Sequence, residues 1–435
     1  MNPVRVGYTL MPRLADLEQL AELLEHDVDY YEVAPETLWR VDARGEWIAN
    51  GYHARALELK ARTHRPIVAH GVGLSVGTLD PRDRARQTKW LERIRTDHEF
   101  FQFDWYTDHL GTSILGADQQ TLPLPLPMAS EVARACRERL VELQSIVPDV
   151  GLENSAVYHH YGDPLDEPAF LNELLDAPRL WQVLDLHNVW TVAVNAGFDP
   201  SAYLARVDLA NVIEIHVSGG AWTDPAWFPG ERKLRLDSHD AAVPEEVWEL
   251  LDEIAPRCPN LRGITLERME GTLEPGDEVR LRAELARVRR AAARCAPNRV
   301  ARKAAEPTGA ASAELAPYVA FENALARALR ERDSLAALRR EVESLPVAQR
   351  DAARAWLAAI DARGFALSAL FADRLRFERL VQASREASEW FERDPADFAR
   401  AFRRYRDAVA PSALHPWGEK ALFDAWRAEF AHAPR

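Results

Sequence analysis

The sequence has few cysteines and no long apolar run. Its 435 residues include three cysteines, Cys136, Cys258 and Cys295. All three lie on or beside predicted helices, so we expect reduced thiols rather than a disulfide framework. No apolar stretch reaches the roughly 18 residues of a membrane-spanning helix, and the first residues lack the basic and apolar segments of a signal peptide. These absences predict a cytoplasmic protein that does not work in a membrane.

An excess of basic residues is also missing. Lys and Arg number 54 against 68 Asp and Glu, which gives a formal net charge of -14. Proteins that bind nucleic acids normally present a basic surface to the phosphates. We therefore expect no nucleic-acid partner, which argues against a DNA-repair nuclease.

What the chain does have is eight short apolar runs, each long enough for a strand that is buried on both faces. The runs are Val4–Leu10, Val28–Glu36, Pro66–Val76, Phe103–Gly111, Val150–Ser155, Trp181–Asn188, Val212–Gly219 and Gly263–Glu270. Segments with apolar residues three and four positions apart lie between them, including Leu14–Leu24, Ala54–Arg62, Arg82–Phe100, Glu131–Ile146, Pro244–Ile254 and Asp277–Ala293. Strand followed by helix, repeated eight times, predicts an α/β fold of the (β/α)8 TIM-barrel type over residues 1–296.

The rest of the chain has a different pattern. Residues 297–317 are rich in Ala with Pro, Gly and Ser, which is typical of a linker. Residues 318–435 have helical spacing throughout and predict a smaller all-α domain without a metal-binding or nucleotide motif. Its expected helices are Phe321–Arg332, Leu335–Ser344, Val347–Ala362, Phe365–Phe391, Asp397–Ala408 and Gly418–Phe430.

Polar residues suited to metal binding stand at the carboxyl ends of the predicted strands or in the loops that follow. Barrels of this type place their chemistry at that end. The candidates are His70, His109, Glu153, Asp185, Asn188, His216, Asp237, His239 and Glu267. Carboxylates brought together repel and raise one another's pKa unless cations neutralise them. Four carboxylates with four histidines and an asparagine therefore predict a site for two or three divalent metals.

Seven strings of residues connect these candidates to a known family. In chain order they are HGVGLSVGT, DHLG, GLENSAVY, LDLHN, IHVSGG, DSHD and TLER. With this order and spacing the chain resembles the multinuclear non-heme iron-dependent oxidases (MNIO, DUF692) over roughly residues 4–290. The same ligand order resembles endonuclease IV and, more distantly, xylose isomerase-like barrels, so the fold alone fixes neither the metal nor the reaction.

The resemblance implies roles for single residues. All nine candidates fall on metal ligands of the family, with Glu153 expected to bridge two metals at the centre. Asn188 stands where endonuclease IV-like enzymes have a His, and Asn there is the oxidase-like choice. Glu153, Asp185 and His239 are the residues that we expect to be catalytic.

The implied chemistry is oxidation of a peptide. The cofactor would be two or three iron ions, Fe(II) or Fe(III), with dioxygen as co-substrate. The substrate would be a ribosomally synthesised precursor peptide, modified on a side chain that is often Cys, and a separate protein often recruits that peptide. A metal-dependent hydrolase or sugar isomerase on the same barrel is the alternative, because zinc suits such donors almost as well. A non-catalytic metal- or peptide-binding protein is the third hypothesis.

Three points stay open at this stage. His187 stands where many family members have Asn, so it either adds a metal ligand or supports one from outside. Glu36 matches a Glu of the family that either orients a ligand or contacts substrate. The helical domain either recruits the peptide in cis or is a packing or dimerisation module.

Overall fold

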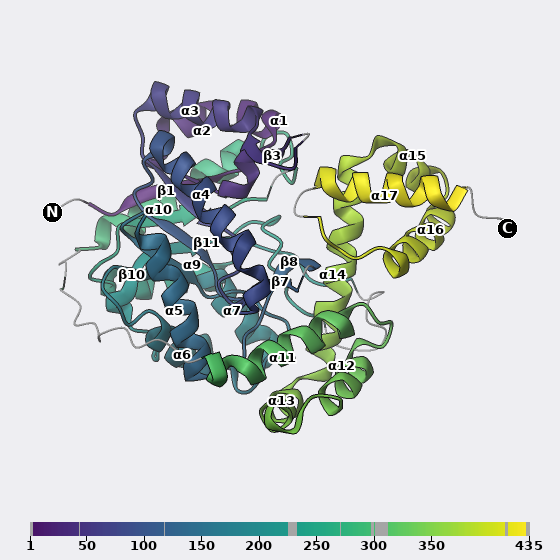
Figure 1. The fold of residues 1–435 in the computed structure, drawn as a ribbon. Coiled ribbons are helices and arrows are strands. Elements are labelled where there is room, and N and C mark those ends of the chain that lie inside the picture. Colours follow the sequence, from purple (N-terminus) through teal and green to yellow (C-terminus); the bar gives the residue numbers. More distant parts are fainter. Residues whose placement is uncertain are drawn as a thin grey trace.

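Eight parallel strands close a barrel in this protein (Figure 1). The computed structural model describes residues 3–42, 44–116, 118–224, 233–269, 271–296, 300, 312–413 and 416–431. The strands pair in the order β1-β12-β11-β10-β9-β6-β5-β2, and β2 pairs with β1 to close the ring. Their bounds are β1 Arg5–Leu10, β2 Tyr30–Val33, β5 Ile67–Gly71, β6 Tyr106–His109, β9 Val150–Glu153, β10 Leu180–Asp185, β11 Val212–Val217 and β12 Gly263–Leu266. Each overlaps one of the eight predicted runs, and the predicted TIM barrel is confirmed.

An apolar cluster fills the amino-terminal end of the barrel. Tyr30, Val68, Trp105, Trp181 and Ile213 are buried against one another there. Large apolar side chains close this end, and the Glu214 carboxylate accepts hydrogen bonds from the Tyr30 hydroxyl and the Trp105 indole at its inner side. The interior therefore has one apolar end and one end available for chemistry.

Helices cover the outside of the barrel. They are α1 Leu14–Gln19, α2 Ala21–His26, α3 Gly51–Thr63, α4 Arg84–Phe101, α5 Ser130–Gln144, α6 Glu167–Leu174, α7 Leu186–Ala196, α8 Pro200–Leu204, α9 Glu245–Ile254 and α10 Asp277–Arg294. Short 3-10 helices lie at Pro35–Leu38, Pro81–Asp83, Pro164–Asp166, Leu209–Asn211 and Ala255–Arg257. The six helical segments predicted for the barrel all coincide with members of this set.

Some local features differ from the sequence-based expectations. Two hairpins, β3 Trp39–Val41 with β4 Trp47–Ala49 and β7 Thr112–Leu115 with β8 Asp118–Leu124, were not predicted. Strand β10 was expected to reach Asn188 but ends at Asp185. The Asp185 carboxylate accepts the Asn188 backbone N–H at 2.7 Å and starts helix α7. The apolar run continues across this cap, so periodicity alone could not locate it.

Residues 312–431, the helical region, contain the remaining helices. They are α11 Ser312–Leu329, α12 Ser334–Glu343, α13 Val347–Ala359, α14 Ala362–Ala383, α15 Arg385–Arg393, α16 Pro395–Ala408 and α17 Pro416–Ala431. Helix α11 begins inside the range expected to be linker, and residues 297–299 and 301–311 of that range lie outside the described residues. The single helix expected over Phe365–Phe391 is two helices, because the Ser384 hydroxyl accepts the Ala387 backbone N–H at 3.2 Å and caps α15.

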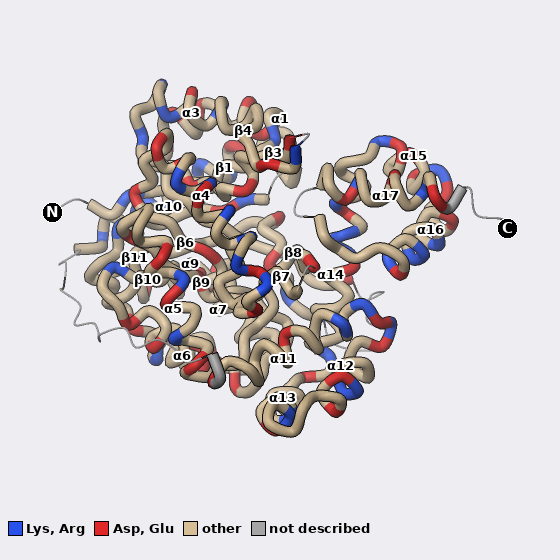
Figure 2. Tube along the Cα trace, viewed as in Figure 1, with Lys and Arg blue, Asp and Glu red and all other residues tan. Residues whose placement is uncertain are grey.

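The helical region has two parts. Helices α11–α13 lie along the edge of the barrel, and α14 leads from them to a group formed by α15–α17 (Figure 1). Basic and acidic residues are mixed along these helices (Figure 2). Exposed pairs such as Arg374–Glu378 and Arg385–Glu389 are one helical turn apart, which is typical of a solvated face. Within the described residues, no helix combines the length and apolarity needed to cross a membrane.

Candidate metal centre

The structure brings all nine predicted ligands together at the carboxyl end of the barrel. Five stand on strands, namely His70 on β5, His109 on β6, Glu153 on β9, Asp185 on β10 and His216 on β11. The others are Asn188 in the first turn of α7, Glu267 directly after β12, and Asp237 and His239 in the loop between β11 and α9. Parallel strands end at one rim of a barrel, which is why residues far apart in the sequence meet here.

Glu153 lies at the centre of the cluster and is 2% exposed. Its Oε2 is 3.0 Å from His70 Nε2 and 3.1 Å from His109 Nε2. The other nitrogen of each ring is fixed from behind. His70 Nδ1 lies 2.9 Å from the Thr107 hydroxyl, and His109 Nδ1 lies 3.0 Å from the Gly71 carbonyl. This leaves both Nε2 atoms directed at one oxygen of Glu153, an arrangement that suits one metal ion.

A second group shares Glu153. It contains Glu153, Asp185, His216 and Glu267, all buried, with donor atoms within 4.8 Å of one another. His216 Nδ1 is 3.6 Å from Glu153 Oε1 and 3.3 Å from Glu267 Oε1. Since Glu153 presents one oxygen to this group and the other to His70 and His109, it can bridge two metals.

The third group is centred on Asp237. His239 Nε2 is 2.7 Å from Asp237 Oδ1 and 3.8 Å from Glu267 Oε2, so the group adjoins the second one. Asn188 reaches in from α7, where its amide nitrogen lies 3.3 Å from Glu153 Oε1 and 3.1 Å from the Asn154 carbonyl. Its carboxamide oxygen has no hydrogen-bond partner.

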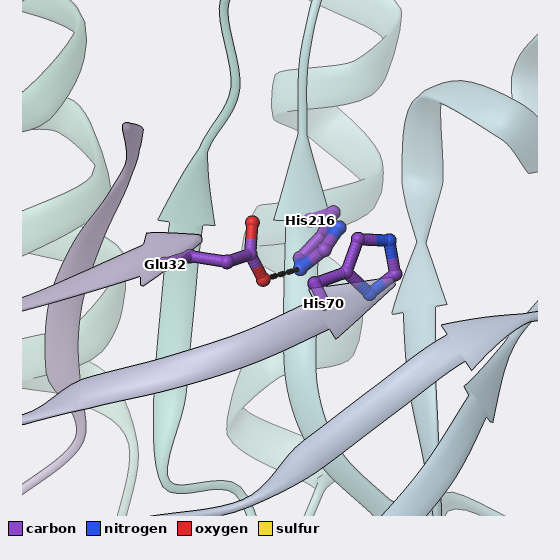
Figure 3. Close-up of side chains that lie close together, drawn as sticks. All are labelled: Glu32, His70 and His216. Atoms are coloured by element: carbon purple, nitrogen blue, oxygen red, sulfur yellow. Dashed lines mark ion pairs between the residues drawn. The ribbon is translucent and has the colours of Figure 1, made fainter. Parts of the chain in front are cut away.

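Glu32 on β2 is a site residue that the sequence analysis did not identify. It is fully buried, and its Oε2 lies 3.0 Å from His216 Nε2 across the barrel interior (Figure 3). The Thr9 hydroxyl donates to the other oxygen at 2.7 Å. A carboxylate behind the far nitrogen pairs with the imidazole and leaves Nδ1 toward the metal position. Glu32, His70 and His216 are also close enough to hold a metal ion themselves. The available signal was a charged residue inside an otherwise apolar strand, which requires a buried partner.

Glu36 acts on the segment that follows His70. Its Oε1 accepts the Val72 backbone N–H at 2.8 Å. Burial raises the pKa of Glu36, and burial together with the charge of Glu36 raises the pKa of Asp108 to about 8. The structure thus shows Glu36 holding the backbone next to a predicted ligand, and a substrate contact stays a prediction.

Negative charge dominates the cluster. Six buried or nearly buried carboxylates lie in it or directly behind it, namely Glu32, Glu153, Asp185, Glu214, Asp237 and Glu267. Within the described ranges none of the six forms an ion pair with Lys or Arg, and their charged partners are histidines. So many neighbouring carboxylates need protons or metal cations to neutralise their charge.

Protons can take part of that role. Burial, with the charges of neighbouring carboxylates, raises the pKa of Asp185 well above its usual range. Burial lowers the pKa of His109 and His187, whereas at His70 and His239 the neighbouring carboxylates outweigh it. They raise the pKa of His70 to about 9 and that of His239 to about 10.

Donor atoms in the cluster also lack hydrogen-bond partners. Buried atoms without one include His70 Nε2, Glu153 Oε2, Asp185 Oδ2, Asn188 Oδ1, His216 Nδ1, His239 Nε2 and Glu267 Oε2. Native proteins rarely leave so many buried polar atoms unpaired. Because these atoms belong to the residue types that bind transition metals, the donor set fits a multinuclear metal centre.

The amino-acid sequence of the chain matches one enzyme family. The model of the family described as RiPP precursor modification enzyme MbnB/TglH/ChrH matches residues 7–293. The chain belongs to this family. A UPF0276 protein of Caulobacter vibrioides is 30% identical over 236 residues, which cover 54% of this chain and 79% of that protein.

Solved structures resemble the barrel at lower identity. A D-tagatose 3-epimerase-like protein has a TM-score of 0.41 and 16% identity, and the match covers 65% of this chain and 98% of that one. Endonuclease IV from Thermus thermophilus has a TM-score of 0.39 and 14% identity, over 66% and 99% of the two chains. The family assignment rests on the sequence match.

His187 of this MbnB/TglH/ChrH family member lies with Asp237 and His239 in a group of side chains that could hold a metal ion. The imidazole is fully buried, with Nδ1 3.2 Å from Asp237 Oδ1 and Nε2 3.3 Å from Arg235 Nη2. A guanidinium only donates, so a hydrogen bond from Arg235 makes Nε2 the acceptor. The neutral ring would then carry its proton on Nδ1 and donate it to Asp237. We therefore expect His187 to support Asp237 rather than to bind a metal.

Arg235 is itself held in place. Its guanidinium lies between two indole rings, 4.5 Å from the centroid of Trp190 and 5.1 Å from that of Trp222. Its backbone N–H donates to the Asn195 side chain at 2.8 Å, and the Asn195 amide donates back to the Arg235 carbonyl at 3.0 Å. The orientation of His187 therefore follows from packing on both sides of Arg235.

Replacing His187 with Leu is expected to weaken metal binding at the Asp237 position by roughly 10–100-fold, because a group that orients a metal ligand contributes that much. Replacing His187 with Asn places an amide donor near the original Nδ1 and is expected to restore most of the affinity. Metal titration of the two variants and the wild type measures the effect. Equal affinity in all three would contradict the positioning role.

Proposed function

We propose that this protein is an iron-dependent oxidase that uses dioxygen to modify a side chain of a ribosomally synthesised precursor peptide, with cysteine the expected target. The family match supports a peptide-modifying enzyme. The observation that carries the proposal is Glu153, whose two oxygens face two different groups of metal-binding side chains. A bridged pair of metals suits multi-electron oxidation of a bound side chain, because the two ions can divide the electrons between them.

The proposed ligands form three positions. His70, His109 and Glu153 would hold the first metal, and Asp237 and His239 the third. Asn188 lies beside Glu153, where its free amide oxygen would add a ligand. The second position would be held by Glu153, Asp185, His216 and Glu267. When bound, iron would supply electrons to dioxygen and an open coordination position for the substrate side chain.

The chain's own residues prepare this site. Glu32 fixes the ring of His216, and Thr107 fixes that of His70, so each presents one nitrogen to the metals. Full burial of Asp185 and His216 excludes water from the base of the site. Residues at the rim are more exposed, with His109 and His239 side chains each 17% exposed. The substrate would therefore approach from the side of these two histidines.

Metal analysis combined with oxygen uptake tests the proposal. Protein purified without chelators is expected to contain two or three irons per chain, and to consume dioxygen when a precursor peptide encoded near it is added. A matched peptide with Ser in place of Cys is the control, and it should not stimulate uptake. Stoichiometric zinc or manganese with no oxygen uptake would instead favour the hydrolase or sugar isomerase alternative.

We also propose that the precursor peptide is the partner of this protein and that the two meet in the cytoplasm. Either the helical region or a separate protein would recruit the peptide. Pull-down of the peptide by the full chain, with and without its leader segment, tests recruitment. Equal capture of both forms would contradict a leader-binding role.

A further inference from the structure

The helical region contacts the barrel at the segments that follow the catalytic strands. On α11, the Tyr318 hydroxyl donates to the Gly77 carbonyl at 2.6 Å, and the Glu322 carboxylate accepts the Leu79 N–H at 3.2 Å. Both partners lie in the segment after His70. On α14, Ser368 lies 2.8 Å from His159 Nδ1, in the segment that follows Glu153. These contacts place the helical region against the loops of the site.

Helix α14 also reaches the loop that carries Asp237. Leu236, Leu367 and Phe371 form a buried apolar cluster, the Leu236 cluster. Three partly buried side chains pack against it, and they come from β8, from the segment after β9 and from the loop after β11. They are Leu122, Tyr158 and Leu234. The residue directly before Asp237 is thus anchored on the helical region.

Tyr158 extends this anchor to Asp237 itself. Its ring packs on Phe371 with 4.9 Å between the centroids. Its hydroxyl oxygen accepts the Asp237 backbone N–H at 3.2 Å. The path from α14 to a proposed metal ligand therefore runs through one ring contact and one hydrogen bond.

The Asp237 loop belongs to no helix, and the barrel holds it on its other side. The Leu236 N–H donates to the Ala221 carbonyl at 2.9 Å, and the Ser238 hydroxyl accepts the Ala221 N–H at 2.9 Å. The backbone N–H of Asp237 itself donates to Tyr158, which packs on the helical region. Segments outside regular helices and strands open locally at lower cost unless side-chain packing holds them. A metal ligand on such a segment binds strongly only when its geometry is fixed beforehand.

We infer that helix α14 positions the third metal site: Phe371 and Tyr158 hold the Asp237 loop in its metal-binding geometry, so the helical region is part of the catalytic unit. This inference rests on the proposed function, in which Asp237 and His239 bind a metal. The helical region would then act on the metal centre of its own chain, which neither peptide recruitment nor dimerisation requires.

The test uses the full chain with two neighbouring substitutions on α14. Phe371→Ala removes the ring that contacts Tyr158, and Leu370→Ala, on a side chain that is 37% exposed, is the matched control. Phe371→Ala is expected to weaken metal binding by roughly 10–100-fold at the position that Asp237→Asn abolishes, and to leave the other positions filled. Leu370→Ala should bind metal as the wild type does, and Phe371→Leu should recover part of the loss.

A second variant keeps the packing and removes only the hydrogen bond. Tyr158→Phe preserves the contact with Phe371 but deprives the Asp237 amide of its acceptor. Hydrogen exchange over residues 233–239 is expected to become faster in this variant and in Phe371→Ala. If Phe371→Ala does not fold, metal binding and hydrogen exchange of Tyr158→Phe alone test the inference.

Full metal occupancy and unchanged exchange in both Phe371→Ala and Tyr158→Phe would overturn the inference. Failure of the proposed function would give a different result. If Asp237 does not bind a metal, Asp237→Asn would leave the metal content of the protein unchanged.

Discussion

Replacing Glu153 with Gln is expected to leave the barrel folded and to remove most of its metal. Gln has the size of Glu but offers one neutral oxygen where the carboxylate presents two charged ones to His70, His109 and His216. Removing one partner from a buried set of charges costs about 3–5 kcal/mol. This corresponds to roughly two to four orders of magnitude in metal affinity. Metal content per chain after dialysis, followed by metal titration, measures the loss.

Glu167→Gln is the matched control for this experiment. The Glu167 carboxylate accepts the Tyr203 hydroxyl at 2.7 Å, and burial raises its pKa to about 7, but it is not part of the metal cluster. This variant should retain the metal of the wild type. A Glu153→Gln protein that also retained it would show that Glu153 does not bridge metals.

Removing the metals with a chelator is expected to lower the unfolding temperature, and to lower it more at pH 9 than at pH 6.5. Without metal, protonated His70 and His239 offset the carboxylates, with pKa values of about 9 and about 10. A raised pKa stabilises the fold fully below the unfolded value, which is about 6.5 for His. That stabilisation is lost as the pH rises toward the folded values. Bound metal ions do not titrate in this way.

The size of the effect follows from binding linkage. A ligand at a thousandfold excess over its dissociation constant stabilises the folded state by about 4 kcal/mol, which is roughly 4–5 °C in a chain of this size. Thermal scans of loaded and chelated protein at pH 6.5 and pH 9 measure the difference. An equal difference at both pH values would mean that protons do not replace the metals in this cluster. The Glu153→Gln variant, with little metal to lose, should respond weakly to the chelator.

Much of the fold could be predicted because it depends on local patterns. Runs such as Val212–Gly219 are apolar over the length of one strand, and each run is followed by a segment suited to a helix. Neighbouring residues carry that information. The boundaries were less accurate, as at Asp185, where a cap inside a continuous apolar run ends the strand. The hairpin of β7 and β8 was missed because its strands follow a barrel strand without a helix between them.

The candidate site was predictable to the extent that strand ends identify it. A parallel barrel brings all its strand ends to one rim, so His70, Glu153 and His216 could be expected to meet without knowledge of their distances. Glu32 was missed because the predicted run continued to Glu36, which placed the end of this strand beyond its true end at Val33. Its partner His216 is on β11, which does not pair with β2, and the contact crosses the barrel interior.

The sequence by itself determined the barrel, the family and the residue types at the metal centre, because strand periodicity and the order of strand ends are properties of the chain. Only the tertiary structure decided how Glu153 divides its oxygens between two groups, that His187 lies between Asp237 and Arg235, and that Phe371 on α14 reaches Tyr158 and the Asp237 loop. These contacts join residues that are far apart in the chain. Their geometry is set by closure of the barrel and docking of the helical region, and no local sequence pattern encodes either.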